Sequence, residues 1–140
     1  MMKIFCFFFG AMCAGSVTAG VFEVERFGAK GDGRTKDTAA IQRAIDWAWA
    51  AGGGTVRLGE GTFVSGSIYL RSNVDFFLDE GAVLKGSPDK EDYNPVGVCP
   101  QNSASKAESA SGAHLILCIE QTNVMVRGTG RIDGNSMAFI

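Results

Sequence analysis

The chain has 140 residues, of which 13 are Lys or Arg and 15 are Asp or Glu, so its formal net charge is −2. This length corresponds to one domain or to part of one. The basic residues form no run or stripe, so the sequence lacks the electrostatic signature of a nucleic-acid-binding protein. We therefore expect no nucleic-acid partner, and nothing in the sequence identifies a protein partner.

The N-terminus has the pattern of an export signal. Lys3 precedes an uncharged apolar run from Ile4 to Gly15, and Ser16–Ala19 places small residues where a signal peptidase recognises them. A basic start and an apolar run of roughly 7–15 residues are typical of a signal peptide, whereas a membrane span needs about 20 residues. We predict that residues 1–19 are a signal peptide and that residues 20–140 are secreted or periplasmic, with no membrane partner after cleavage. The alternative for this segment is a buried hydrophobic helix.

One helix is predicted near the start of the remaining chain. Val21–Phe27 alternates apolar and polar residues as a strand does, and the glycines of Gly28–Gly33 predict a turn. Thr35 or Asp37 is suited to cap the N-terminus of the helix, and Gly52–Gly54 is suited to end it in a left-handed C-terminal cap. Between these signals, apolar residues recur at helical spacing along a single face: Ile41, Ala44, Ile45, Ala48 and Trp49.

Beyond these glycines, short apolar runs recur, and most are bounded by Gly, Asn, Asp or Ser. Such runs are typical of short strands. Two-residue Asn-Gly or Asp-Gly turns, which connect the strands of hairpins, are mostly absent between them. The predicted strands are 55–58, 62–64, 68–70, 74–78, 82–84, 115–119, 124–126 and 131–132.

An internal repeat predicts how these strands are arranged. Ser72–Phe76 followed by Gly81–Gly86 recurs as Thr122–Val126 followed by Gly130–Gly134, so each unit has a polar-Asn-Val start, a strand, a glycine corner and a second strand that ends on Gly. Repeats of this kind mark a solenoid whose coils stack on one another. We therefore expect a mainly β protein that forms the first coils of a right-handed parallel β-helix. Corner asparagines should hydrogen-bond along the stack, and the α-helix should cap the N-terminal end.

Residues 88–112 differ in composition from the predicted strands. They contain all three prolines, several serines and several charges, with no pattern suited to a core. We predict a loop that projects from one coil and either forms a wall of a binding groove or is a tolerated insertion. Cys99 lies in this loop, and an oxidising compartment allows it either to pair with Cys118 or to remain a free thiol.

A series of segments, taken in order, resembles a known family. Their order and spacing carry the resemblance, which extends from about Val21 to Phe139. The segments are Phe27–Gly33, Asp37–Gln42, Gly52–Val56, Gly61–Phe63, Gly66–Leu70, Ser72–Val74, Gly81–Leu84, Gly86–Ser87, Asp92–Tyr93 and Gly128–Gly134. They are similar to the N-terminal part of pectin-degrading glycoside hydrolases of the polygalacturonase and rhamnogalacturonase type (family 28), within the pectate-lyase-like β-helix superfamily. Lys36 stands where an acidic residue is usual in that family, and Gly59 stands where proline is common.

The resemblance implies inverting hydrolysis of α-linked galacturonic acid in pectic polysaccharide. This chemistry needs one carboxylic acid to protonate the leaving oxygen and one carboxylate to activate water, about 6.5–9.5 Å apart. The family takes them from an Asn-Thr-Asp segment and an Asp-Asp pair, followed by Gly-His-Gly and Arg-Ile-Lys, and none of these four motifs occurs in the 140 residues. We therefore predict no catalytic, cofactor-binding or metal-binding residue in this chain, and we expect that it does not hydrolyse pectin alone.

Several features suggest other functions. Gly28–Thr35 nearly matches a phosphate-binding loop, but Arg34 occupies the position of the lysine that contacts the phosphates. His114 is either a general base or metal ligand, or a structural or solvent-facing residue. Trp47 and Trp49 are candidates for stacking on sugars, although core packing is the preferred interpretation. For the whole chain, the alternative function is a non-catalytic carbohydrate-binding or tailspike-like β-helix module.

Overall fold

The computed structural model describes residues 20–95 and 114–139. The predicted signal peptide, the part of the predicted loop beyond residue 95, and Cys99 lie outside the described residues. Cys118 lies within them and is an exposed free thiol. None of the helices in these two ranges has the length and apolar character needed to cross a membrane.

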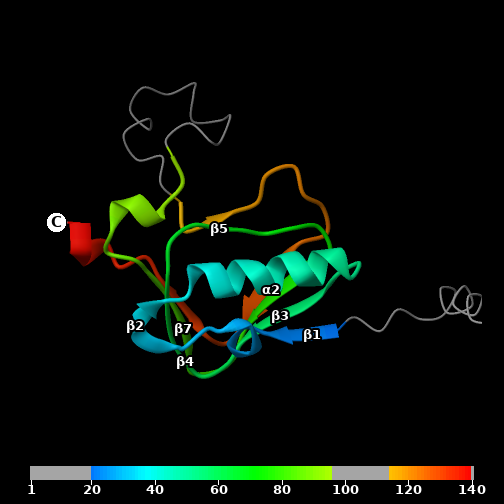
Figure 1. The fold of residues 1–140 in the computed structure, drawn as a ribbon, viewed down its shortest axis with the longest axis horizontal. Coiled ribbons are helices and arrows are strands. Elements are labelled where there is room, and N and C mark those ends of the chain that lie inside the picture. The colour runs from blue at the N-terminus through cyan, green and yellow to red at the C-terminus, as the bar shows by residue number, and fades with distance from the viewer. Residues whose placement is uncertain (1–19, 96–113, 140) are drawn as a thin grey trace, which may run out of the picture.

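The described chain winds through short parallel strands that return repeatedly to the same three sheets (Figure 1). The first sheet contains, in order, β1 (Gly20–Glu23), β3 (Gly54–Leu58), β6 (Val74–Leu78) and β9 (Met125–Gly128). The second contains β2 (Asp32–Lys36), β4 (Gly61–Ser65), β7 (Ala82–Gly86) and β10 (Arg131–Asp133), and the third contains β5 (Ile68–Tyr69) and β8 (Ile116–Leu117). Every pairing is parallel. The fold is a right-handed parallel β-helix, as the internal repeat predicts.

Successive coils stack in register, so their inward-facing side chains form rows through the core. The buried members of these rows are apolar residues that are 0–1% exposed, such as Phe63 and Phe76. Burying one such side chain contributes about 1.5–3 kcal/mol relative to leaving it exposed, so the rows hold the coils together. Two rows of three are Val56, Phe76 and Val126 in the first sheet, and Phe63, Leu84 and Ile132 in the second.

The strand predicted over Val21–Phe27 is too long. β1 ends at Glu23, and the 3-10 helix η1 (Val24–Phe27) follows it. Val24 is 0% exposed, and its carbonyl accepts a hydrogen bond from the Ala29 N–H over 3.2 Å, so the chain turns here to bury this side chain. The alternating pattern therefore continues past the residue at which the backbone leaves the sheet.

The sequence patterns do not predict β2, because all five of its residues are exposed. Its backbone is extended because it pairs with β4, with Asp32 opposite Thr62 and Lys36 opposite Val64. The register shifts between these two positions. A strand that depends on long-range pairing in this way carries no local apolar signal.

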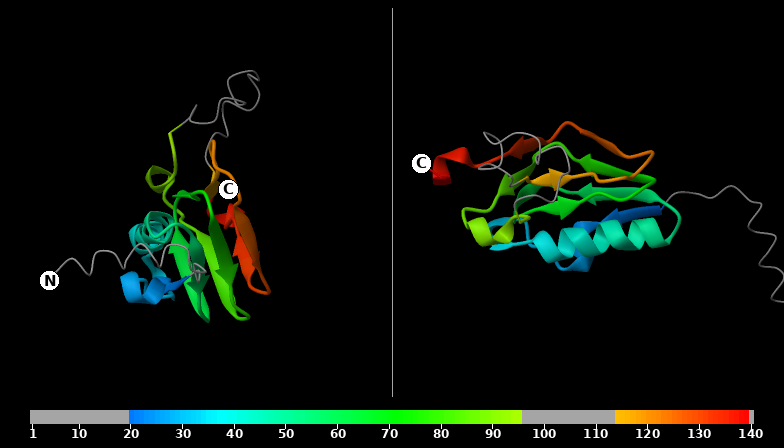
Figure 2. Two further views of the ribbon diagram at one scale, coloured as in Figure 1. Left: turned by 90° about the vertical axis from the view of Figure 1, so that its right-hand side faces the viewer. Right: turned by 90° about the horizontal axis from the view of Figure 1, so that it is seen from above.

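The predicted helix is α2 (Thr38–Ala50), and it covers the end of the stack beside β1, opposite β9 and β10 (Figure 2). The Gly53 N–H donates to the Ala48 carbonyl over 2.8 Å and the Gly52 N–H donates to the Trp49 carbonyl over 3.0 Å, which confirms the predicted left-handed cap. The prediction that Trp47 and Trp49 pack in the core is wrong. These two residues are 61% and 45% exposed, because they flank the buried face of α2. That face consists of Ala40, Ile41, Ala44, Ile45 and Ala48.

Polar side chains of α2 take the place of a strand beside β5. The Gln42 amide donates to the Tyr69 carbonyl over 3.0 Å and accepts from the Tyr69 N–H over 2.8 Å, which is the bonding that a neighbouring strand would provide. Thr38, one helical turn away on the same face, accepts a hydrogen bond from the Gly66 N–H over 2.9 Å. The helix therefore satisfies the strand edge as well as covering the apolar end of the core.

The two asparagines of the internal repeat lie at equivalent corners of successive coils. Asn73 and Asn123 both have left-handed backbones, with φ of 66° and 55°. The Asn123 side-chain amide donates to the Asn73 side-chain oxygen over 2.9 Å. This contact confirms the predicted hydrogen bonding along the stack.

We predict that Gln42→Ala lowers the free energy of unfolding by about 1–3 kcal/mol, because it leaves the Tyr69 N–H and carbonyl without their partners. Urea unfolding followed by circular dichroism should show a lower midpoint with an unchanged slope. Asp46→Ala is the control, since it removes the other hydrogen bond of the Gln42 amide and leaves both contacts to Tyr69 in place, and it should change the stability less. Equal stability of all three proteins would contradict a strand-like role for Gln42.

The opposite end of the described stack exposes an apolar edge. Val126 and Ile132 are 45% and 46% exposed although they continue rows whose other members are buried. Within the described ranges, β9 and β10 are also the outermost strands of their sheets. Exposed apolar strand edges favour pairing with another chain.

We predict that the chain self-associates through this edge and that replacing Val126 and Ile132 together by Lys raises the fraction of monomer. Sedimentation velocity over a range of concentrations measures this fraction. Val21→Lys is the control, because Val21 is 60% exposed at the other end of the stack. An equal gain of monomer in the control, or a wild-type chain that stays monomeric throughout, would overturn the assignment of the edge.

Candidate functional site

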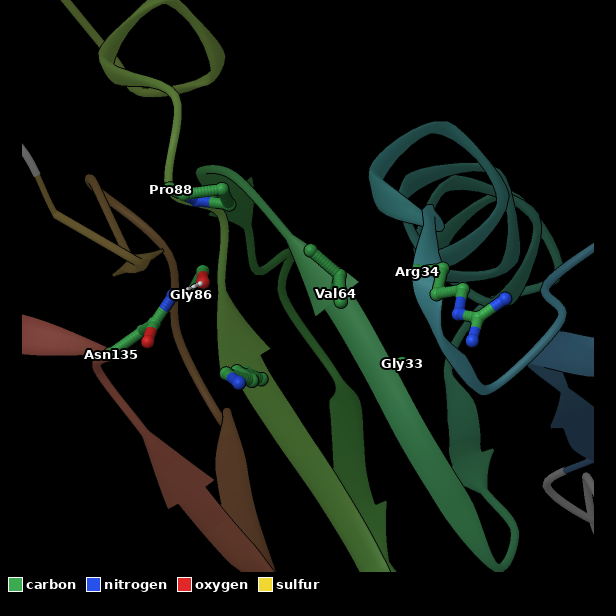
Figure 3. A pocket seen from close by; sticks show the side chains of 7 residues that line it. Gly33, Arg34, Val64, Gly86, Pro88 and Asn135 are labelled. Atoms are coloured by element: carbon green, nitrogen blue, oxygen red, sulfur yellow. Dashed lines mark hydrogen bonds between the residues drawn. The ribbon is translucent and has the colours of Figure 1, made fainter. Parts of the chain in front are cut away.

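A groove of about 180 Å³ lies on the outer face of the second sheet (Figure 3). Its walls come from segments far apart in the sequence, with Arg34 on one side, Asn135 on the other and Val64 between them. The residues that line it are Gly33, Arg34, Val64, Lys85, Gly86, Pro88 and Asn135. The second sheet thus brings the first coils together into one concave surface.

Strand geometry explains why these side chains face outward together. In β7, Ala82 and Leu84 are buried while Val83 and Lys85 point away from the core. Val64 is in register with Lys85 and forms the apolar floor of the groove. Parallel strands lie about 4.8 Å apart, so β2 and β7, on either side of β4, are separated by roughly 10 Å.

The charges that line the groove are basic. Arg34 and Lys85 are its two ionisable lining residues, and neither side chain makes an ion pair with any other described residue. No Asp or Glu is among the lining residues. The groove is therefore suited to bind an anionic group, and it offers no carboxylate for general acid or base catalysis.

The loop that leads to Arg34 is held by a buried aspartate. Asp37 is 1% exposed, and its carboxylate accepts the backbone N–H groups of Lys30 over 2.8 Å and Gly31 over 3.0 Å. Asp37 occupies the N-cap position of α2, but its side chain makes no capping hydrogen bond to the helix. The side chain thus fixes the preceding loop against the helix.

The same contacts argue against phosphate binding by Gly28–Thr35. The carboxylate of Asp32 accepts the N–H groups of Arg34 and Thr35 over 2.9 and 2.7 Å, and the Thr35 hydroxyl over 2.8 Å. Carboxylates therefore already occupy the N–H groups that a phosphate would need. These hydrogen bonds, most strongly those from the Thr35 and Arg34 N–H groups, lower the pKa of Asp32 from 3.8 to about 2.

The wall opposite Arg34 is fixed by Asn135. Its side-chain amide donates to the Gly86 carbonyl over 2.9 Å, and its own N–H donates to the Asp133 carboxylate over 2.9 Å. Asn135 has a left-handed backbone with φ of 54°, a conformation that asparagine tolerates better than most residues. The turn after β10 is therefore pinned to the end of β7.

The segment Ser87–Tyr93, which we call the strap, carries Pro88 over the groove. Lys36, the last residue of β2, binds the strap through Asp89 over 2.6 Å and Asp92 over 2.8 Å. These two hydrogen bonds, led by that of Asp89, raise the pKa of Lys36. The hydrogen bond from Lys36 and then that from the Ser87 hydroxyl lower the pKa of Asp92.

The remaining residues considered from the sequence lie outside the groove. The His114 N–H donates to the Asn94 side chain over 2.7 Å, and the Ser67 hydroxyl donates to the His114 carbonyl. The ring of Trp47 lies 6.3 Å from that of Phe27, measured between centroids, and Trp49 lies beneath the Arg71 guanidinium at 3.8 Å. No group of three or more His, Cys, Asp or Glu suited to a metal ion occurs among the described residues.

Pro88 lies in the loop that was predicted either to form a groove wall or to be a tolerated insertion, and the other lining residues were not predicted. The outward direction of Lys85 could have been predicted from the sequence, because Lys85 alternates with the apolar residues Ala82 and Leu84. Arg34 carries no such signal, since β2 lacks an apolar pattern. The walls of the groove meet only because the coils stack, and local sequence does not encode that meeting.

Residues 21–137 match the family described as rhamnogalacturonase A/epimerase, pectate lyase-like. The chain belongs to this family. Its resemblance to hydrolases of the polygalacturonase and rhamnogalacturonase type is thereby confirmed.

Relatives of this family member are much longer than the chain. It is 34% identical over 123 residues to an exo-poly-alpha-D-galacturonosidase from Dickeya chrysanthemi, covering 82% of this chain and 19% of that protein. The family 28 exopolygalacturonase of Yersinia enterocolitica is 33% identical with a TM-score of 0.67, and the match covers 84% of this chain and 21% of that one. A 61-residue match to a mannuronan C5-epimerase from Azotobacter vinelandii is 63% identical and covers 38% of this chain and 6% of that protein. The chain therefore spans about a fifth or less of the length of these relatives.

The lowered pKa of Asp32 predicts an acid-sensitive loop. Because the pKa is lower in the folded chain than the ordinary 3.8, the carboxylate stabilises the loop above that pH, and this contribution is lost as the pH falls toward about 2. Hydrogen exchange should show the Arg34 and Thr35 amides losing protection across this window. The Gly53 amide, which bonds to a carbonyl, is the internal control. In Asp32→Asn the protection should become independent of pH, and a wild-type Asp32 that titrates near 3.8 would contradict the prediction.

Proposed function

We propose that this chain is the N-terminal portion of an exported glycoside hydrolase that acts on pectin, either galacturonan or rhamnogalacturonan, by inverting hydrolysis. In this proposal residues 1–19 are the signal peptide, and residues 20–140 are the first part of the β-helix domain. The product is secreted or periplasmic. The relatives described as polygalacturonases support the substrate class.

The observation that carries the proposal is the basic groove. Pectic polysaccharide is a polymer of uronic acids, so it presents carboxylates at regular intervals along its length. Arg34 and Lys85 line the groove without ion-pair partners among the described residues, and Val64, which is 6% exposed, lies in its floor. This combination suits an acidic polysaccharide better than a neutral one.

Catalysis is assigned to coils other than those described. Inverting hydrolysis needs two carboxyl groups about 6.5–9.5 Å apart on either side of the scissile bond, and the lining residues of the groove include none. The exposed Val126 and Ile132 are positions that a further stacked coil would cover. The proposed role of this chain is therefore to provide the scaffold and one end of the substrate groove.

A non-catalytic carbohydrate-binding module is the second candidate. It is favoured by the same groove, which has the features needed for binding and lacks those needed for hydrolysis. The mannuronan C5-epimerase match extends the comparison to another uronate polymer, because that enzyme is named for mannuronan. The two candidates share the prediction of binding and differ in whether the protein that contains this chain cleaves what it binds.

Titration of the chain with polygalacturonate tests the proposal. We expect binding that weakens with salt, and we expect Arg34→Ala and Lys85→Ala each to weaken it about tenfold, because each removes one charged contact. Lys30→Ala is the control, since Lys30 is exposed and does not line the groove. The chain alone should release no reducing ends from polygalacturonate.

Three results would redirect the proposal. Equal binding of polygalacturonate and a neutral galactan would remove the role of the basic residues. Tighter binding of alginate than of polygalacturonate would favour the uronate polymer of the epimerase match. Release of reducing ends by the chain would show that a catalytic pair exists among its own residues.

A further inference from the structure

We propose that Lys36 is a positioning residue that keeps the groove cationic by offsetting one of the two negative charges that the strap carboxylates, Asp89 and Asp92, place at its border. This inference rests on the proposed function, because it concerns how an acidic polysaccharide enters the groove. It assigns a role to a residue that does not line the groove.

The contacts place Lys36 between the two sides of the site. It ends β2, the strand that carries Gly33 and Arg34, and it is in register with Val64 of the groove floor. Its ammonium group lies 2.6 Å from Asp89 and 2.8 Å from Asp92, which are 53 and 56 residues further along the chain. Pro88, next to Asp89 in sequence, is itself a lining residue. The two carboxylates therefore lie at the border of the groove.

Their charges matter to an anionic ligand at this distance. Charges separated by less than the Debye length of about 8 Å at physiological salt interact without full screening. With Lys36 present, one ammonium group faces two carboxylates, and the side chains of Lys90 and Glu91 in the same strap have opposite signs. Without Lys36, the net charge of this cluster would fall from −1 to −2 at the border of a site whose own basic groups are Arg34 and Lys85.

Other contacts hold the strap in place, so the role of Lys36 is separable from folding. The Ser67 N–H donates to the Asp92 carbonyl over 3.0 Å, and the Tyr93 hydroxyl donates to the Ser87 carbonyl over 2.8 Å. Gly66 allows this close approach, because a Cβ there would lie 1.9 Å from the Asp92 carbonyl oxygen. The Lys36–Asp89 ion pair is exposed on both sides, and exposed ion pairs contribute little to stability.

The test is a mutant cycle on the full chain with polygalacturonate as the probe. We expect Lys36→Ala to weaken binding about fivefold at low salt and less at high salt, with an unchanged circular dichroism spectrum. Lys36→Arg should bind as the wild type does. The double variant Lys36→Ala/Asp89→Asn should return to within about twofold of the wild type, because it removes one positive and one negative charge and so restores the wild-type net charge. Binding of a neutral galactan should not change in any variant.

The outcomes separate this inference from the proposed function. If the wild type binds and Lys36→Ala binds equally well, neutralisation by Lys36 is wrong and the groove assignment stands. If the double variant Lys36→Ala/Asp89→Asn is as weak as Lys36→Ala, Lys36 acts through structure and the inference is overturned. If the wild type does not bind polygalacturonate, the proposed function fails, and this inference fails with it.

Discussion

In-register stacking of parallel strands is the constraint on which the rest of this structure depends. Each coil must present an apolar row to the next, as Phe76 does between Val56 and Val126. Each coil must also offer its backbone N–H and carbonyl groups to both neighbours. Both needs are met inside the stack and unmet at its ends, so the ends require separate solutions. At the N-terminal end, α2 buries an apolar face over the core, and Gln42 bonds to Tyr69 as a strand would.

The same constraint leaves the outward positions free to vary. A residue that faces the core must fit its row. Lys85, one position away from the buried Leu84, faces outward and is not constrained by core packing. Stacking then places outward residues of successive coils beside one another at a spacing that the backbone sets. A groove on such a face needs no special backbone, because turns of unequal length supply its walls. Pro88 in the strap and Asn135 in the turn after β10 are examples.

Much of this fold could be predicted from the sequence because its determinants are local. Short apolar runs mark β3 through β10, the three glycines end α2, and the repeated Asn73 and Asn123 indicate stacked corners. The failures have a common cause, which is that a distant partner decides the outcome. β2 is a strand because β4 lies beside it. The candidate site, whose lining runs from Gly33 to Asn135, exists only once the coils are stacked. From the sequence, the only statement possible about its chemistry was that the catalytic motifs of the family are absent.

A basic groove without carboxylates has a defined energetic role in the proposed hydrolase. Contacts made away from the scissile bond hold the substrate equally well in the ground state and in the transition state, so by themselves they lower KM and leave kcat unchanged. Arg34 and Lys85 would supply binding of this kind. Carboxylates placed beside them would repel the uronate chain, which explains why the aspartates nearest the groove are each engaged. Asp37, Asp32 and Asp133 hold backbone N–H groups, and Asp89 and Asp92 hold Lys36. The acidic residues around the site therefore have structural roles, and in the proposed hydrolase the unpaired charges of Arg34 and Lys85 bind the substrate.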